Sequence, residues 1–159
     1  MIMADTPHMD ILLVEDNPVH ARIMMRALEL GEDDQVHHVE DGADALAYLH
    51  VEDNGNGNGN GNGGDGEADS AELPDLVLLD LQLPTVDGFE VLEAMRQSDA
   101  TRHVPVIVIS TSDQQHDIAR AYGAGANAFL IKPADFGRFI EQMKALRQFW
   151  CEAAELPET

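Results

Sequence analysis

The stretch Leu76-Val77-Leu78-Leu79-Asp80-Leu81-Gln82-Leu83-Pro84 decides the fold, because it is a nearly continuous apolar run that follows Pro74-Asp75 and ends at a second proline. So short and apolar a run predicts a strand that is buried on both faces. Asp80 is the exception, since an ionised carboxylate is costly to bury unless it is paired or coordinates a metal. Either Asp80 is a structural anomaly, or the strand exists to present it.

Strand and helix patterns alternate along the rest of the chain. Strands are expected at 10–14, 35–39, 76–84, 104–109 and 128–131, and helices at 18–31, 41–49, 87–96, 112–122 and 136–150. Asn17 and Pro18 are a good N-cap and first residue for the first helix, and Ser112 or Asp113 is expected to cap the fourth. The apolar face of the first helix is predicted from helical spacing to be Val19, Ile23, Ala27 and Leu30.

This alternation predicts an α/β fold. The order βαβαβαβαβα implies parallel strands joined by right-handed crossovers, with helices covering both faces of a doubly wound sheet in a three-layer sandwich. In such sheets, sites gather at the carboxyl ends of the strands, near the switch in strand order.

Three segments are expected to lie outside the folded domain of residues 10–150. Residues 1–9 are predicted to be a flexible tail, and residues 151–159 an acidic tail. The Asn-Gly repeat that begins at residue 54 has almost no side chains to bury, which predicts a disordered insertion at about 53–72. The repeat lacks the strand, GK[ST] motif and helix of a phosphate-binding loop.

The charge of the chain excludes two classes of partner. Its 159 residues carry a formal net charge of −21, with 30 acidic residues against nine Lys and Arg. Such a surface repels nucleic acids and anionic membranes, and its composition resembles that of proteins from high-salt cytoplasm. Cys151 is the single cysteine and is expected to be a plain small hydrophobe, and no apolar segment is long enough to span a membrane. A cytoplasmic location is expected.

Polar residues follow four of the predicted strands directly. They are Glu15 and Asp16, Asp80, Ser110, and Lys132. Carboxylates this close repel one another unless a cation lies among them, and oxygen ligands with open positions favour Mg²⁺. A Lys ammonium and a Ser hydroxyl beside them are suited to hold phosphoryl oxygens.

Five motifs in order resemble the signature of response-regulator receiver domains of two-component signalling. They are Val14-Glu15-Asp16-Asn17, Leu78 to Pro84, Asp87-Gly88, Ser110-Thr111-Ser112 and Lys132-Pro133. The resemblance runs from about residue 10 to 150 and implies a chemotaxis-regulator-like, flavodoxin-like (βα)5 fold with strand order 2-1-3-4-5. The LxLP-x-x-DG wording and Phe149-Trp150 further resemble stand-alone receivers often paired with phytochrome-like or other sensor kinases.

The resemblance implies a role for each motif residue. Asp80 would accept a phosphoryl group from the phosphohistidine of a kinase, and Ser110 and Lys132 would then bond its oxygens. Magnesium would be held by Asp16 directly, by Glu15 mostly through water, by Asp80 and by the backbone carbonyl of Gln82. Phe129 would be the aromatic switch that moves with Ser110, although an aromatic residue there would also pack as plain core.

The function expected is that of a single-domain response regulator, a phosphoacceptor switch and not an enzyme. Its partners would be a sensor histidine kinase or phosphotransfer protein and a downstream protein target, bound through the fourth helix, last strand and last helix. The oligomeric state is left open, with a homodimer among the options. Two alternatives are a hydrolase of the haloacid dehalogenase type and a degenerate receiver. The first requires an acid where Gln82 stands, and the complete acidic set argues against the second.

Overall fold

The computed structural model describes residues 9–28, 31–32, 34–51 and 73–157. The predicted insertion at 53–72 and nearly all of the predicted N-terminal tail lie outside these residues. Five strands alternate with five helices in the described part of the chain. The strands are β1 (Asp10–Val14), β2 (Gln35–Val39), β3 (Leu76–Leu79), β4 (Val106–Ser110) and β5 (Ala128–Ile131). The helices are α1 (Pro18–Leu28), α2 (Gly42–Tyr48), α3 (Gly88–Gln97), α4 (Gln115–Gly123) and α5 (Phe136–Arg147), followed by a π-helical turn, η1 (Gln148–Ala153).

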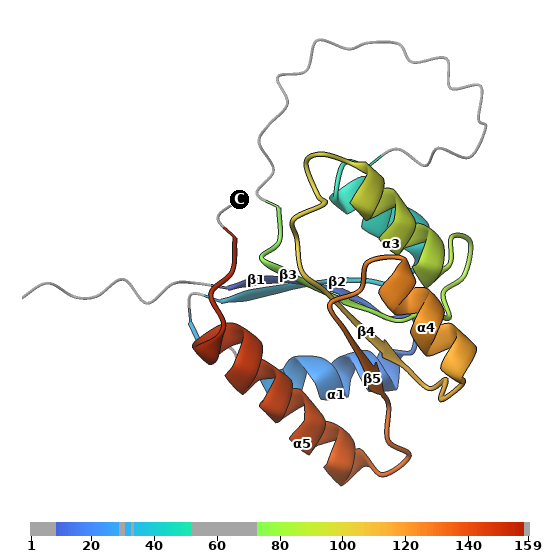
Figure 1. Ribbon diagram of the computed structural model, residues 1–159. Coiled ribbons are helices and arrows are strands. Elements are labelled where there is room, and N and C mark those ends of the chain that lie inside the picture. Colours follow the sequence, from blue (N-terminus) through green and yellow to red (C-terminus); the bar gives the residue numbers. More distant parts are fainter. Residues whose placement is uncertain (1–8, 29–30, 33, 52–72, 158–159) are drawn as a thin grey trace, which may run out of the picture.

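All five strands are parallel and form one sheet in the order β2-β1-β3-β4-β5, as expected. Helices α1 and α5 lie side by side on one face, and α2, α3 and α4 cover the other (Figure 1). Since the three central strands are covered on both faces, every residue of β3 and β4 is buried. This explains why their sequences are apolar runs and do not alternate.

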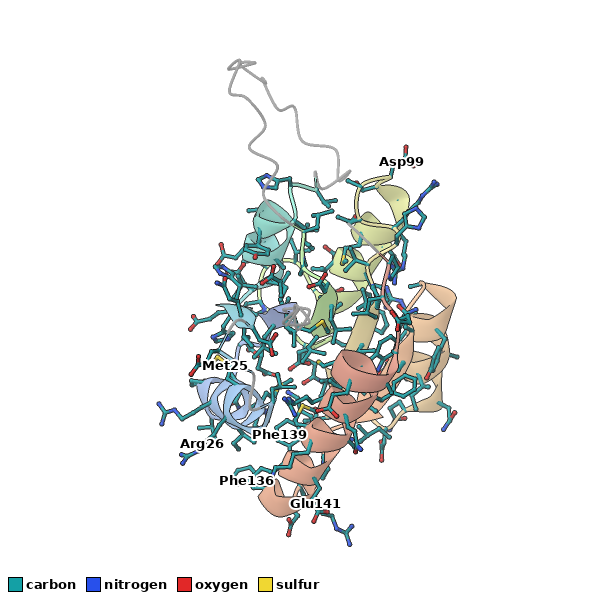
Figure 2. All side chains as sticks on the ribbon, turned by 90° about the vertical axis from the view of Figure 1, so that its left-hand side faces the viewer. Met25, Arg26, Asp99, Phe136, Phe139 and Glu141 are labelled. Carbon is teal, nitrogen blue, oxygen red and sulfur yellow. The ribbon has the colours of Figure 1, made fainter. Side chains whose placement is uncertain are left out.

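Alternate residues of each central strand enter different cores. Leu12, Val77 and Val108 point into the core shared with α2 and α3. Ile11, Leu78 and other strand residues enter the second core, which α1 and α5 complete through Met24, Phe139 and Met143. The arrangement of α1 beside α5 is visible from the side in Figure 2.

Two details of the predicted helices are wrong. Of the face predicted for α1, Ala27 is buried and Ile23 packs against the core, but Val19 is 52% exposed, and Leu30 lies outside the described residues. The buried face also includes Ala21, Met24 and Leu28, which were not predicted. Helix α4 has Gln114 as its N-cap, without a side-chain cap, in place of Ser112 or Asp113. The Ser112 hydroxyl instead donates to Asp117 Oδ2 at 2.6 Å. A local bond to the first turn of α4 thus engages the Ser112 hydroxyl, which was predicted to cap the helix.

The end of the chain packs against the second core. Trp150, Cys151 and Leu156 all contact it, so Cys151 and Leu156, expected to lie in an acidic tail, contribute apolar contacts. Cys151 is half-buried, and burial raises the pKa of its thiol to about 11, which fits the predicted small hydrophobe. No helix in the ranges that the structure describes is long and apolar enough to cross a membrane.

Arg96 joins three segments at the amino-terminal edge of β4 and β5. Its guanidinium donates to the carbonyl oxygens of Gly125, Arg102 and Val104 at 2.8–3.0 Å, and to Asn127 Oδ1 at 3.0 Å. These bonds fix the end of α3 to the entry of β4 and to the turn before β5. The contact lies at the opposite edge of the sheet from the residues predicted to form the site.

We predict that Arg96→Met lowers the free energy of unfolding by about 2 kcal/mol, because several acceptors lose a charged donor in a half-buried place. Arg102→Met is the matched control. Its guanidinium lies at the surface, where it pairs with the exposed Asp99 and bonds the neighbouring His103, and its loss should cost less than about 0.5 kcal/mol. Urea denaturation of both variants measures the difference. Equal effects would show that the Arg96 bonds do not stabilise this edge.

Candidate functional site

The predicted site residues meet at the carboxyl edge of the sheet. The register pairs Val14 with Leu79 and Ser110 with Ile131, so the residues that follow these strands emerge side by side. Glu15 and Asp80 come directly after β1 and β3, and Lys132 directly after β5. All three are buried, as is Ser110 at the end of β4. Parallel topology therefore brings together residues that are far apart in sequence.

Lys132 connects two of the carboxylates. Its ammonium donates to Glu15 Oε2 at 2.6 Å and to Asp80 Oδ2 at 2.9 Å, and the three side chains are at most 7% exposed. Its backbone N–H donates to the Ser110 carbonyl at 2.8 Å, which fixes the start of the chain after β5 beside β4. A buried carboxylate needs such a partner, so Lys132 accounts for the burial of Asp80.

The acidic residues also fit a divalent cation. One carboxylate oxygen each from Glu15, Asp16 and Asp80 lies within 4.8 Å of the others. Glu15 and Asp80 are buried while Asp16 is exposed, which leaves the cluster open to solvent on one side. Three carboxylates facing one ammonium retain excess negative charge, and an all-oxygen donor set is what hard divalent cations prefer. The cluster is therefore suited to hold such an ion.

The pKa of Glu15 shows that the charged form of this carboxylate is disfavoured in the cluster. Burial and the charge of Asp80 raise its pKa to about 7, against the opposing effects of Lys132 and of a hydrogen bond from the Asn17 N–H. The carboxylate is thus held where its charged form is disfavoured. A cation bound beside it would reverse this, because opposite charge favours the ionised form.

Local backbone features position the carboxylates. Asn17 Oδ1 accepts the N–H groups of Val19 and His20 at 3.0 and 3.1 Å, which confirms Asn17 as the cap of α1 and places the β1–α1 turn. The Gln82 N–H donates to Asp80 Oδ1 at 3.0 Å. Gly88 starts α3 against β3, where an added Cβ would lie 2.3 Å from the Asp80 carbonyl oxygen. Only glycine allows this approach, so Gly88 serves the packing beneath Asp80.

Ser110 and Phe129 lie on neighbouring strands. Ser110 Oγ accepts the N–H of Ser112 at 3.2 Å. Phe129 is half-buried against the first core, and its N–H donates to the Tyr122 hydroxyl at 3.2 Å. Both residues therefore connect the sheet to the region before and along α4. Their motion, like the metal role of the Gln82 carbonyl, remains a prediction.

Two histidines also contact the site, although nothing in the sequence indicated these contacts. His38 of β2 bonds the Glu15 carbonyl oxygen through Nε2 at 2.7 Å. His20 Nδ1 lies 3.1 Å from Lys132 Nζ. The parallel register of β1 and β2 pairs Leu13 with His38, and could have placed His38 near the end of β1. His20 carried no such signal.

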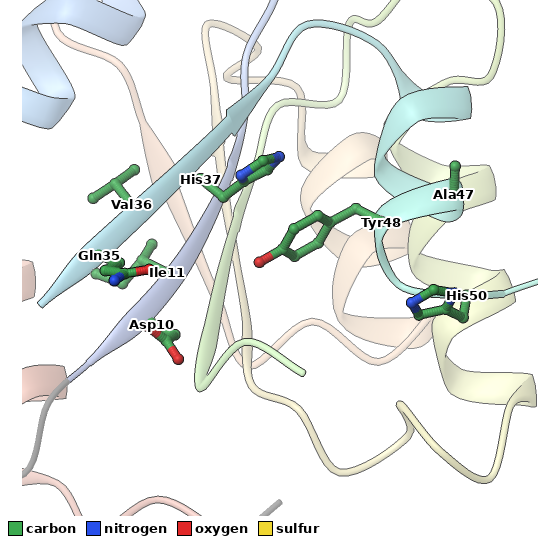
Figure 3. Close-up of a pocket in the computed structure, with 8 residues that line it drawn as sticks. All are labelled: Asp10, Ile11, Gln35, Val36, His37, Ala47, Tyr48 and His50. Carbon is green, nitrogen blue, oxygen red and sulfur yellow. The ribbon is translucent and has the colours of Figure 1, made fainter. Parts of the chain in front are cut away.

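A cavity elsewhere contains none of these residues. It has a volume of about 460 Å³ and lies between β1, β2 and α2, where His37 stacks on Tyr48 with ring centroids 4.2 Å apart (Figure 3). Its lining includes Asp10 and Ile11 from the start of β1, at the opposite edge of the sheet from Asp80. The candidate site is therefore the acidic cluster and not this cavity.

The sequence is similar to a family model and to known regulatory proteins. The family model described as the response regulator receiver domain matches residues 61–144. The probable methanogenesis regulatory protein FilR2 of Methanothrix harundinacea is 39% identical over 88% of this chain and 82% of its own. The response regulator Rcp1 of Synechocystis is 30% identical over 92% of both chains.

Solved structures agree with the sequence matches. The phosphorylated cyanobacterial phytochrome response regulator RcpA superposes with a TM-score of 0.82 at 35% identity, over 96% of this chain and all of that one. The Mn²⁺-bound form of Rcp1 gives a TM-score of 0.80 at 30% identity, over 94% and 99% of the two chains. The fold, the acidic cluster and these relatives together show that the chain belongs to the response-regulator receiver domain family of two-component signalling.

Proposed function

We propose that Asp80 accepts a phosphoryl group from a phosphohistidine of a sensor histidine kinase or phosphotransfer protein. The observation that carries the proposal is the buried Asp80 carboxylate, bonded to Lys132 Nζ at 2.9 Å within an acidic cluster open to solvent. Receiver domains are generally phosphoacceptor switches, and a phosphorylated relative has the same fold.

The transfer is a displacement at phosphorus. An Asp80 carboxylate oxygen attacks, the P–N bond to the donor imidazole breaks, and the imidazole leaves with the bonding electrons and takes up a proton. Lys132 moves its N–H from Asp80 Oδ2 to a phosphoryl oxygen, while the Gln82 N–H remains at Oδ1. A magnesium ion held by Glu15, Asp16, Asp80 and the Gln82 carbonyl would neutralise charge on the phosphoryl oxygens.

The chain is proposed to act as a switch and not as a turnover enzyme. A phosphohydrolase that forms an aspartyl phosphate needs a general acid beside it, and Gln82 occupies the position two residues after Asp80. Its output is then a change of surface read by a downstream protein. The α4-β5-α5 face fits this role, because Tyr122 and Ile131 on it are 50% and 41% exposed.

The proposal is tested with a small phosphodonor. Incubation with MgCl₂ and acetyl phosphate should add one phosphoryl group per chain, detected by intact-protein mass spectrometry. Excess EDTA should prevent the addition, because the carboxylate cluster then repels the incoming phosphate. A chain that gains no phosphoryl group, or gains it equally well in EDTA, contradicts the proposed function.

The switch makes a separate prediction. A bond from the Ser110 hydroxyl to a phosphoryl oxygen would reorient the group that accepts the Ser112 N–H, so phosphorylation should shift the amide NMR signals of Ser112 and Phe129. Ser110→Ala should still take up phosphate but lose the shift at Phe129, because no hydroxyl links the phosphoryl group to β5. Ser98→Ala, at the far end of α3, is the control. An unchanged Phe129 shift in Ser110→Ala would refute the coupling.

A further inference from the structure

The ammonium of Lys132 has a third acceptor besides the two carboxylates. Its Nζ lies 3.1 Å from His20 Nδ1, 2.6 Å from Glu15 Oε2 and 2.9 Å from Asp80 Oδ2. An ammonium carries three N–H donors and no acceptor. The three neighbours therefore match its three protons, and each proton has one partner.

This contact fixes the form of the imidazole. Since Lys132 can only donate, His20 Nδ1 must be unprotonated and accept, which leaves the ring proton on Nε2. Burial and the nearby Lys132 charge lower the pKa of His20, in agreement with a neutral ring. The contact with Lys132 thus determines the tautomer of His20.

His20 is held in place at its backbone and at its ring. Its backbone N–H is bonded by Asn17 Oδ1 at 3.1 Å, in the first turn of α1. Its ring packs at a tilt against Phe139 of α5, with centroids 5.9 Å apart. His20 is half-buried, so its imidazole is held between the Lys132 ammonium and the second core.

We propose that His20 is a positioning residue for Lys132 during phosphoryl transfer, an inference that rests on the proposed function of Asp80. Glu15 and His20 hold two of the ammonium protons, so that the third is the one free to turn from Asp80 Oδ2 to the phosphoryl oxygen. Without His20, the ammonium is held by the carboxylates alone and its donors are less well directed.

The alternative is that His20 only packs against Phe139, and two substitutions separate the two roles. His20→Leu keeps apolar packing but removes the acceptor. His20→Asn loses the ring but keeps an oxygen, Oδ1, at the same distance from the backbone as Nδ1. If His20 positions Lys132, the His20→Asn variant should keep the native rate of phosphoryl uptake and the His20→Leu variant should not. If His20 only packs, the reverse is expected.

The experiment measures the rate of phosphoryl uptake from acetyl phosphate and MgCl₂ by mass spectrometry. His20→Leu should be about three- to tenfold slower than the native chain, the range for loss of one hydrogen bond. His20→Asn should lie within about twofold of native. His103→Leu, an exposed histidine bonded to Arg102, is the control. If His20→Leu does not fold, as judged by circular dichroism, His20→Ala replaces it.

A double-mutant cycle tests whether His20 acts through Lys132. In a Lys132→Ala background, His20→Leu should cause no further loss of rate, because its partner is absent. The inference is overturned if His20→Leu matches native, if Asn is as slow as Leu, or if the loss persists without Lys132. Absence of uptake by the native chain would instead contradict the proposed function itself.

Discussion

Asp80→Asn is expected to reduce phosphoryl uptake at least about 1,000-fold, because an amide oxygen is a far weaker nucleophile than a carboxylate. The side chain keeps its shape, so the Gln82 N–H can still bond Oδ1 and the fold should persist. The measurement is intact-protein mass spectrometry after incubation with acetyl phosphate and MgCl₂.

Asp113→Asn is the matched control for this change. Asp113 lies exposed in the loop after β4, where its Oδ1 accepts a hydrogen bond from the Gln114 side chain at 3.2 Å. Its substitution removes one negative charge at the same edge of the sheet without touching the cluster, and uptake should be unchanged. Uptake retained in Asp80→Asn, or lost equally in both variants, would count against Asp80 as the acceptor.

Removal of the divalent cation should have the second largest effect, a loss of stability. Substitution of Asp16 is the best test of this effect. Mg²⁺ at about 100 times its dissociation constant should raise the free energy of unfolding of the native chain by about 2.7 kcal/mol. Asp16→Asn should lose most of this gain, because it removes one of the three clustered carboxylates. Without cation, the same variant should be more stable than native, since fewer like charges repel.

The raised pKa of Glu15 predicts in which direction the stability of the fold changes with pH. Folding raises the pKa of Glu15 from 4.5 to about 7, so between these values the folded chain binds a proton that the unfolded chain has lost. The contribution of Glu15 to stability is therefore fully present below pH 4.5 and is lost as pH rises through about 7. Saturating Mg²⁺ should offset the loss.

Urea denaturation in EDTA and in MgCl₂, from pH 5 to pH 8, measures both effects. Glu15→Gln isolates the contribution of Glu15, because the other acidic groups titrate in both proteins. The native chain should lose stability relative to Glu15→Gln as pH rises in EDTA, and the difference should shrink in MgCl₂. Opposite slopes, or a response to Mg²⁺ that Asp16→Asn leaves intact, would exclude the cluster as the cation site.

Much of the fold could be predicted because burial on both faces leaves a plain signature. The runs Leu76–Leu79 and Val106–Ile109 are apolar without alternation, and both lie in central strands. Once the strands are parallel, the residues that follow them must meet, which is why Glu15, Asp80 and Lys132 could be grouped before their contacts were known.

The errors arose where contacts made in the folded chain differ from those that simple spacing or capping rules predict. Helical spacing from Val19 placed Ala27 and Ile23 correctly but missed Ala21 and Met24, which pack the core while Val19 is exposed. The Ser112 hydroxyl bonds Asp117 and does not cap α4. The contacts of His38 with Glu15 and of His20 with Lys132 join residues 23 and 112 positions apart, which no local pattern indicates.

The central claim is that Asp80 carries the phosphoryl group, and chemical trapping tests it most directly. Borohydride reduces an aspartyl phosphate to homoserine, a change that survives proteolysis and can be located by tandem mass spectrometry. The native chain, treated with acetyl phosphate and MgCl₂ and then reduced, should yield homoserine at position 80 and nowhere else. Homoserine at another aspartate, or unmodified Asp80 in a chain that has gained phosphate, would contradict the account.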